Sequence, residues 1–384
     1  MTSEVLAGEG AKVPMRGRLD YLDGIRALAA LFVVAHHVYL QVYPGFPENT
    51  GPWFLGWLLY GNFAVAVFIV VSGYSLTLAP ARRQFHLGMG YWPYLKRRAW
   101  RILPAYWAAV LLSSLIFVAL IERRTDVSIG IRDVLVHLGL VQDMVRNTPP
   151  NGALWSIAVE WQLYFVFPLF LFARRRVGAA TTALIGVVGV WAINVVARNS
   201  APFHRLLNLT PQFAALFIFG MIAAGATARR QPREGEAASR VPWGWITVGL
   251  FVASVAACAL LGSERVLGVD LYWSDLAVGT TAACLLAALS GPGTSAAKRL
   301  LQHRTIVGTG HFSYSIYLVH APILAVGWLY VVEPLHWSRN ASFVLMLVSV
   351  VPVAIAASYG FYRLVERPFL NRRAAVTARP AARG

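Results

Sequence analysis

Long apolar stretches follow one another along almost the whole chain, and short segments with charges and turn residues separate them. Nearly every stretch is long enough for an α-helix to cross a ~30 Å hydrocarbon layer, which takes about 20 apolar residues. The pattern therefore predicts an all-α polytopic membrane protein with about ten transmembrane helices. The predicted spans are 26–43, 54–79, 102–121, 152–173, 178–197, 211–227, 242–261, 271–290, 312–332 and 342–364.

Two tails, at 1–25 and 365–384, flank this predicted ten-helix domain at 26–364. The apolar run at 131–143 is too short to span and is expected in or at the membrane interface. No cleavable signal peptide is expected, because the first apolar run carries an arginine and two histidines and has the character of a retained span.

Basic residues are distributed unevenly between the two sides that this topology defines. Of the 34 Lys and Arg residues, 26 fall in segments on the side of the N-terminus and 8 on the other side. Because short cytoplasmic loops are enriched in Lys and Arg, both tails are expected in the cytoplasm, and the protein is expected in the cell membrane. This topology also accounts for the net charge of +17. Nucleic-acid binding is not expected, since the charge is scattered over short loops.

The composition agrees with a lipid bilayer as the surroundings, since 57% of the residues are hydrophobic and only 13% are charged. The two cysteines, Cys258 and Cys284, both lie inside apolar spans. No group of residues has the spacing of metal ligands. We therefore expect no structural disulfide, no metal and no permanently bound cofactor.

The first predicted span, DGIRALAALFVVAHHVYL, contains side chains that are costly to bury in a membrane. Arg26 and His37 are eleven residues apart, which brings them to nearly the same helix face and about 16 Å apart along the axis. His36 is rotated by about 100° from that face. Ionisable residues inside a span usually face a partner or a water-filled cavity. A cation near one surface and an acid–base group at mid-depth predict a catalytic tunnel.

Three arginines, Arg97, Arg98 and Arg101, cluster where the third predicted span begins. Arg98 and Arg101 are three residues apart and are therefore neighbours on a helix face. Planar guanidinium groups bind phosphate oxygens with two parallel hydrogen bonds, so the cluster is a candidate phosphate site. The alternative is an anchor that touches lipid headgroups at the cytoplasmic end of a helix.

Glu160 lies inside the span that contains LWSIAVEWQLYFVFP, about 12 Å below the outer edge of the membrane. His37, which enters from the opposite side, reaches about the same depth. A carboxylate at that depth could orient the imidazole and raise its basicity. The alternative is a glutamate that binds an arginine or a backbone group and holds helices together.

Two further motifs lie in apolar spans. Ser72-Gly73-Tyr74 offers small residues that let helices approach closely, and a packing role is favoured there. The segment HFSYSIYLVHAP at 311–322 places Ser313, Tyr314, Tyr317 and His320 in the ninth span. His320 is either a second site residue or a hydrogen-bonded histidine near the interface.

Taken together, these segments resemble acyltransferase family 3, a family of integral membrane proteins. The resemblance rests on ordered motifs: Arg26 with His37, Ser72-Gly73-Tyr74, Arg98-x-x-Arg101 with Ile102 and Pro104, Leu154-Trp155-Ser156 with Glu160, Gln162 and Tyr164, Ser313 to Leu318 with His320, and Glu366-Arg367-Pro368. Trp161 departs from the family pattern, which often has an acid or polar residue there. No appended SGNH-type domain is evident, so a stand-alone membrane form is expected.

The resemblance implies transfer of an acyl group, commonly acetyl, from cytoplasmic acyl-CoA to a hydroxyl of a sugar-containing acceptor. Such an acceptor is an envelope polysaccharide, a glycolipid or a glycosylated natural product. His37 would take the hydroxyl proton or carry the acyl group, Glu160 would orient or charge His37, and Arg26 would hold a neighbour of the imidazole or a donor phosphate. Acyl-CoA, as co-substrate, would bind Arg97, Arg98 and Arg101. The expected substrate-lining residues are Ser72, Tyr74, Trp155, Tyr164, Tyr314 and His320.

The alternative from another class is a proton-coupled transporter or flippase, which would also use Arg, His and Glu within the membrane. The sequence shows no pair of interrupted helices in inverted repeats, which many such carriers have. A purely structural scaffold would leave the buried charges without a role.

Overall fold

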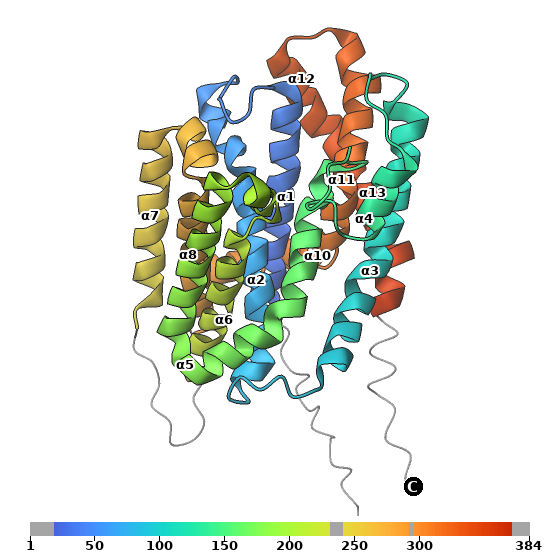
Figure 1. The fold of residues 1–384 in the computed structure, drawn as a ribbon. Helices are drawn as coiled ribbons and strands as arrows, with labels where there is room; N and C mark the ends of the chain where they lie inside the picture. Colours follow the sequence, from blue (N-terminus) through green and yellow to red (C-terminus); the bar gives the residue numbers. More distant parts are fainter. Residues whose placement is uncertain (1–18, 231–240, 292, 294, 371–384) are drawn as a thin grey trace, which may run out of the picture.

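The computed structural model describes residues 19–230, 241–291, 293 and 295–370. These residues form helices joined by loops, without any strand (Figure 1), which confirms the predicted all-α fold. The helices are α1 (Asp20–Val42), α2 (Asn62–Ala81), α3 (Tyr91–Ile116), α4 (Ile131–Leu138), α5 (Trp155–Asn199), α6 (Gln212–Arg230), α7 (Trp243–Leu261), α8 (Leu271–Leu289), α9 (Ala296–Leu301), α10 (Arg304–Gly310), α11 (Ser313–Gly327), α12 (Arg339–Leu345) and α13 (Val351–Phe361). Most of the predicted tails, residues 1–18 and 371–384, lies outside the described residues.

Nine helical segments in the described part of the chain are long and apolar enough to cross a membrane, where the sequence predicted ten. The difference arises at α5, because the predicted spans 152–173 and 178–197 both fall within the single segment Gly152–Asn199. The 45 residues of α5 would extend about 68 Å if straight, more than twice the ~30 Å of a hydrocarbon core. Gly178, with φ +85°, interrupts the helix with a backbone conformation that glycine adopts readily. Figure 1 shows α5 turning back, so its two arms run in opposite directions.

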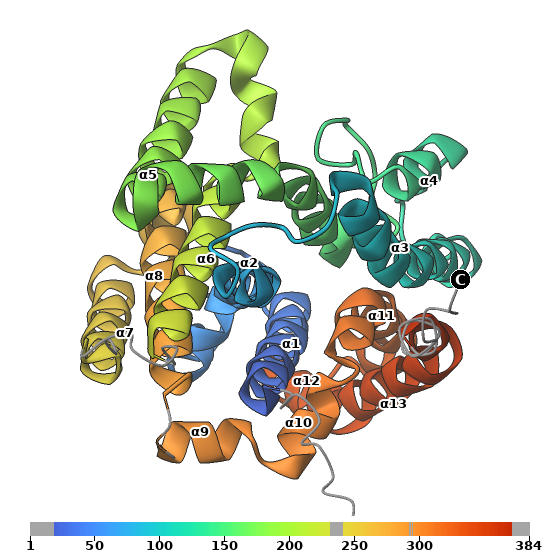
Figure 2. The same cartoon turned by 90° about the horizontal axis from the view of Figure 1, so that it is seen from below.

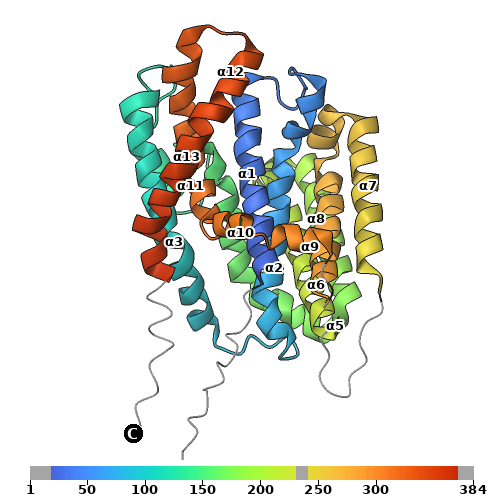
Figure 3. The same cartoon turned by 180° about the vertical axis from the view of Figure 1, so that it is seen from behind.

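Other predicted boundaries differ from the structure at helix starts. The third helix, α3, begins at Tyr91 rather than near residue 102, so Arg98 and Arg101 lie inside the helix instead of at its first turn. Pro104 is likewise within α3. The eight-residue helix α4 confirms that the run at 131–143 contains no span. Helices α9 and α10 lie across the bundle rather than along it (Figure 3).

Helix α1 occupies the middle of the bundle. Seen along the helices, it separates the group of α2, α6 and α8 from the group of α10, α11 and α13 (Figure 2). Because α1 contacts α2, α10 and α11, its side chains can meet residues from both groups. The predicted tunnel residues of α1 therefore stand where the two groups face each other.

Close backbone contact joins α2 to α6. A Cβ atom added at Gly73 would lie 2.2 Å from the carbonyl oxygen of Phe217, and one at Gly220 would lie 2.0 Å from that of Val70. Only glycine fits at such distances, so the packing role favoured for Gly73 is confirmed. The adjacent Tyr74 is fully buried, and its hydroxyl oxygen lies 3.0 Å from that of Tyr21.

Candidate active site

A cavity of about 190 Å³, here called the central cavity, lies inside the bundle. Its walls come from α1, α2, α3, α5, α10 and α11 and from the end of the last apolar segment, Arg339–Leu370, so it unites motifs that are far apart in the sequence. Seven of the predicted site residues line it: Arg26, Ser72, Arg98, Arg101, Glu160, Tyr164 and Tyr314. The tertiary structure thus brings the separate motifs into one site.

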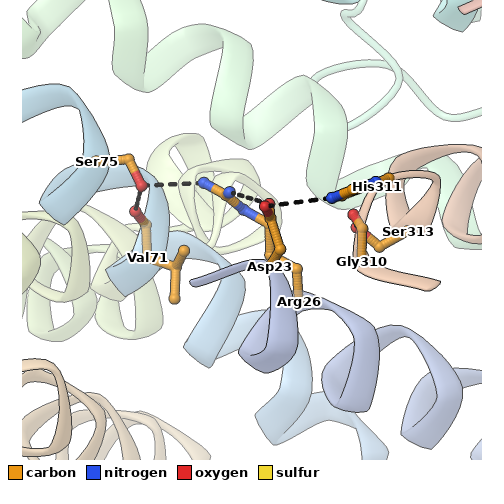
Figure 4. A network of polar contacts seen from close by, with 7 residues as sticks. All are labelled: Asp23, Arg26, Val71, Ser75, Gly310, His311 and Ser313. Atoms are coloured by element: carbon orange, nitrogen blue, oxygen red, sulfur yellow. Dashed lines mark hydrogen bonds and ion pairs between the residues drawn. The ribbon is translucent and has the colours of Figure 1, made fainter. Parts of the chain in front are cut away.

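Arg26 is held between two helices. Its Nη2 donates a hydrogen bond of 2.9 Å to Ser75 Oγ on α2, and Ser75 in turn donates to the carbonyl oxygen of Val71 at 2.6 Å (Figure 4). Its Nη1 lies 3.5 Å from Asp23 Oδ1, one turn earlier on α1. The other oxygen of Asp23 lies 3.9 Å from His311 Nε2, between α10 and α11. This network fixes the direction of the guanidinium group at the cavity wall.

Glu160 belongs to the arginine side of the site. Tyr164, one turn along α5, donates a hydrogen bond of 2.6 Å to Glu160 Oε1. Because the tyrosine hydrogen is used there, Ser72 Oγ donates to the Tyr164 oxygen at 3.3 Å. The Glu160 carboxylate also interacts electrostatically with Arg26 and Arg98. No hydrogen bond or ion pair among the described residues joins Glu160 to His37, so the predicted direct pair is not found.

The three arginines of α3 do not all face the same way, because they lie on different faces of the helix. Arg98 and Arg101 both line the central cavity, as their spacing on one face predicts. The Nε atom of Arg98 is buried and has no hydrogen-bond partner among the described residues. Arg97 is exposed and does not line the cavity, because it lies on another face of α3. A buried donor without an acceptor among these residues is a position that a water molecule or a ligand can complete.

His37 is paired with His320. The Nδ1 atom of His37 lies 2.9 Å from the carbonyl oxygen of Val33 and 3.3 Å from His320 Nε2. His320 Nδ1 lies 2.9 Å from the carbonyl oxygen of Ile316 and 3.0 Å from that of Tyr317. Carbonyl oxygens only accept, so both Nδ1 atoms carry a hydrogen in the neutral rings. The single Nδ1 hydrogen of His37 is therefore shared between the Val33 carbonyl oxygen at 2.9 Å and His320 Nε2 at 3.3 Å, and His37 Nε2 keeps its lone pair.

One aromatic side chain connects the histidine pair to the central cavity. Tyr317 lines the cavity, and its ring centroid lies 6.0 Å from that of His320. Its hydroxyl oxygen lies 2.6 Å from Ser156 Oγ, which also lines the cavity. His37 is not in the cavity wall, but it is only half-buried, whereas His320 is fully buried. His37 thus lies outside the cavity wall with part of its surface exposed.

Three predicted lining residues are not in the cavity wall: His320, which pairs with His37, and two residues that are placed elsewhere. Tyr74 points away into the contact between α1, α2 and α6, and its hydroxyl oxygen lies 2.9 Å from Thr227 Oγ1. Trp155 packs against Phe213, with ring centroids 5.6 Å apart. Neither lines the central cavity. Both side chains contribute to helix packing.

The structure also adds cavity residues that the sequence reasoning missed, among them Asp23, Ser75, His311 and Glu366. Ser75 could have been found, because it lies three residues after Ser72 and so shares its helix face. Glu366 accepts a hydrogen bond of 2.6 Å from Ser315 Oγ. Its position at the end of the last apolar span was a signal of the same kind as that of Glu160.

In the part of the chain that the structure describes, nine helical segments long enough to cross a membrane surround a buried polar cavity, as expected for a multi-pass membrane enzyme. The acyltransferase domain family matches residues 19–363 of the chain. The chain belongs to this family, acyltransferase family 3, and is an O-acyltransferase.

The relatives share about a quarter of their residues with the chain. It is 25% identical over 378 residues to YrhL of Bacillus subtilis, named as a candidate peptidoglycan O-acetyltransferase, and covers 54% of that longer protein with 90% of its own length. It is 25% identical to the acyltransferase MdmB of Streptomyces mycarofaciens, with 94% of the chain and 95% of MdmB covered. It is also 25% identical to the O-acetyl transferase of Shigella phage Sf6, with 91% and 96% covered. No solved structure matches the chain.

Proposed function

We propose that the protein transfers an acetyl group from cytoplasmic acyl-CoA to a hydroxyl of a sugar-containing acceptor at the cell membrane. The observation that carries the proposal is the arrangement along one path: arginines at a cavity, then Tyr317, then a histidine with a free lone pair. The names of the relatives support O-acetylation, and that of YrhL supports a cell-envelope glycan as acceptor.

The donor end of the path is the part lined by Arg26, Arg98 and Arg101. An acyl-CoA carries phosphate groups, for which guanidinium groups are well suited. The unpartnered Nε of Arg98 supports an anionic ligand there. Glu160 and Tyr164 hold this side of the site in place, which replaces the role first expected for Glu160 at the imidazole.

The membrane orientation follows from the distribution of basic residues and puts both termini in the cytoplasm. Figure 1 shows the described ends of the chain near the same end of the bundle. Asp23 and Leu370, close to those ends, line the central cavity. The cavity would then be reached from the cytoplasm, where acyl-CoA is made.

His37 is the general base of the proposed reaction. Its Nε2 takes the proton of the acceptor hydroxyl while the oxygen attacks the thioester carbonyl carbon. The new C–O bond forms, the C–S bond breaks, and the departing CoA thiolate takes the proton back from the imidazolium. His320 Nε2 accepts the hydrogen bond from His37 Nδ1–H throughout, which stabilises the positive charge on the ring.

The test uses the purified protein in nanodiscs with acetyl-CoA. Binding of acetyl-CoA, and slow release of CoA without an acceptor, are expected for the wild type, with release lost in His37→Ala. Mass spectrometry of envelope glycans and small-molecule products, comparing a deletion strain with its complement, would then identify the acetylated acceptor. Absence of acetyl-CoA binding would contradict the proposal and favour the transporter interpretation.

A further inference from the structure

A second and larger cavity, here called the adjoining cavity, has a volume of about 670 Å³. It shares Asp23, Arg26, Ser75 and Arg101 with the central cavity, so the two meet at the Arg26 network of Figure 4. Its remaining walls come from the start of α1 and the ends of α2, α6 and α8, together with α9. Apart from the shared residues Arg26 and Arg101, none of the predicted site residues lines this cavity.

The two cavities have different volumes and can therefore hold molecules of different size. Sites for small molecules usually measure about 300–1,000 Å³. The central cavity, at about 190 Å³, is too small for a whole coenzyme A ester, whereas the adjoining cavity, at about 670 Å³, is of the usual size. Because the two cavities share wall residues, a donor longer than the central cavity can extend from one into the other.

The two cavities differ more clearly in the charged groups that line them than in volume. The arginines of the central cavity face three carboxyl groups, those of Asp23, Glu160 and Glu366. Among the described residues of the adjoining cavity wall, the only carboxyl group is that of Asp23, and the cations are Arg26, Arg82, Arg101 and Lys298. The adjoining cavity is therefore the more cationic of the two and the better environment for a polyanion.

Lys298 is placed by the short helix α9. Ser295 caps this helix, since its Oγ accepts a hydrogen bond of 3.2 Å from the backbone N–H of Lys298. The Lys298 ammonium group donates one hydrogen bond of 2.8 Å, to the carbonyl oxygen of Gly291. An ammonium group has three hydrogens, so two are left for a ligand in the cavity. Apolar side chains on the same walls, Leu22, Leu78 and Leu289, suit a flat heteroaromatic ring.

We propose that the adjoining cavity binds the phosphorylated nucleotide head of the acyl donor, the 3′-phosphoadenosine diphosphate of coenzyme A. Lys298 and Arg82 bind its 3′-phosphate, Arg26 and Arg101 at the junction and Arg98 in the central cavity bind its diphosphate, and the thioester end lies in the central cavity. The head carries about four negative charges, and the cavity wall holds four cations and one carboxyl group, that of Asp23. This inference rests on the proposed use of acyl-CoA.

The test measures binding of acetyl-CoA and dephospho-acetyl-CoA, and turnover of acetyl-CoA and of S-acetylpantetheine, which lacks the nucleotide. Lys298→Ala and Arg82→Ala should each weaken acetyl-CoA binding about 10- to 150-fold, the loss expected for a charge-assisted phosphate contact. They should raise KM with kcat unchanged, and turnover of S-acetylpantetheine should stay at the wild-type level. The control is Arg299→Ala, a neighbouring cation of α9 that lines neither cavity, and it should bind acetyl-CoA like the wild type.

The possible results separate this inference from the proposed function. If the wild type binds no acetyl-CoA, the proposed donor is wrong. If the wild type binds it and both variants bind equally well, the donor stands and the nucleotide site is refuted. Equal losses with acetyl-CoA and S-acetylpantetheine would show a structural role for the two residues and also refute the site. Loss of acetyl-CoA binding in nanodiscs with anionic phospholipid, but not with phosphatidylcholine, would show that the cavity holds a lipid headgroup instead.

Discussion

Replacement of His320 tests the proposed mechanism most directly. In the structure His320 Nε2 accepts the hydrogen bond from His37 Nδ1 at 3.3 Å. His320→Leu removes this acceptor but fills most of the buried space, which limits the damage to packing. His320→Gln places an amide oxygen near the position of Nε2 and can accept the same hydrogen bond.

The expected loss of kcat in His320→Leu follows from the positive charge that His37 gains during the reaction. The hydrogen bond is between neutral groups in the resting enzyme but has a charged donor once His37 is an imidazolium. A hydrogen bond to a charged group is worth about 1.5–3 kcal/mol. Because the Val33 carbonyl oxygen shares the same hydrogen at 2.9 Å, this value is an upper limit, and His320→Leu should lower kcat by no more than about 150-fold. KM for acetyl-CoA should stay unchanged, because His320 does not line the cavity that holds the donor.

The assay is CoA release at saturating acetyl-CoA, with thermal melting of each variant as the check on folding. His36→Leu is the matched control, since His36 Nδ1 is directed at the carbonyl oxygen of Leu58 rather than at His37, and it should keep most of its kcat. His320→Gln should recover much of the loss. A folded His320→Leu with more than half of the wild-type kcat, or a glutamine variant as slow as the leucine variant, would refute the reasoning.

Four further outcomes are expected. His37→Ala should lower transfer by about 10²–10⁴-fold while insertion into the membrane stays normal, and retention of more than about a tenth of the activity would exclude His37 as the base. Arg98→Ala should weaken acetyl-CoA binding about 10- to 150-fold, with Arg98→Lys recovering part of it; unchanged affinity would assign Arg98 to lipid anchoring. Gly73→Ala should destabilise the fold in detergent melting, because its Cβ would lie 2.2 Å from a backbone oxygen, and a wild-type melting temperature would contradict that contact. Burial raises the pKa of Asp143, in the loop before α5, to about 7, so the folded state loses stability as pH rises from about 4 towards 7. Asp143→Asn should therefore raise the melting temperature at pH 8 and change it little at pH 4. Equal changes in melting temperature at the two pH values would show that titration of Asp143 is not the cause.

Much of the fold could be read from single segments, since the length of an apolar run reports whether a helix can cross a bilayer. The same is true of residue pairs on one helix. Arg98 and Arg101 share a cavity because three residues nearly complete a helical turn. The number of spans was predicted incorrectly only at α5, where Gly178 joins two predicted spans without a loop. A glycine can bend the chain within one or two residues, and the length of an apolar run does not show this.

The contacts between helices could not be predicted from single segments. The depth estimate put Glu160 and His37 at the same level, but depth along an axis does not say which helices are neighbours or which way a side chain turns around its helix. Packing turns Glu160 towards Tyr164 and the arginines, and it places His320 of α11 against His37 of α1. Tyr74 and Trp155 likewise face neighbouring helices because the packing of α1, α2, α5 and α6 buries those faces. Which side chains meet in the site depends on the simultaneous packing of many side chains from several helices, and no single segment of the sequence determines that packing.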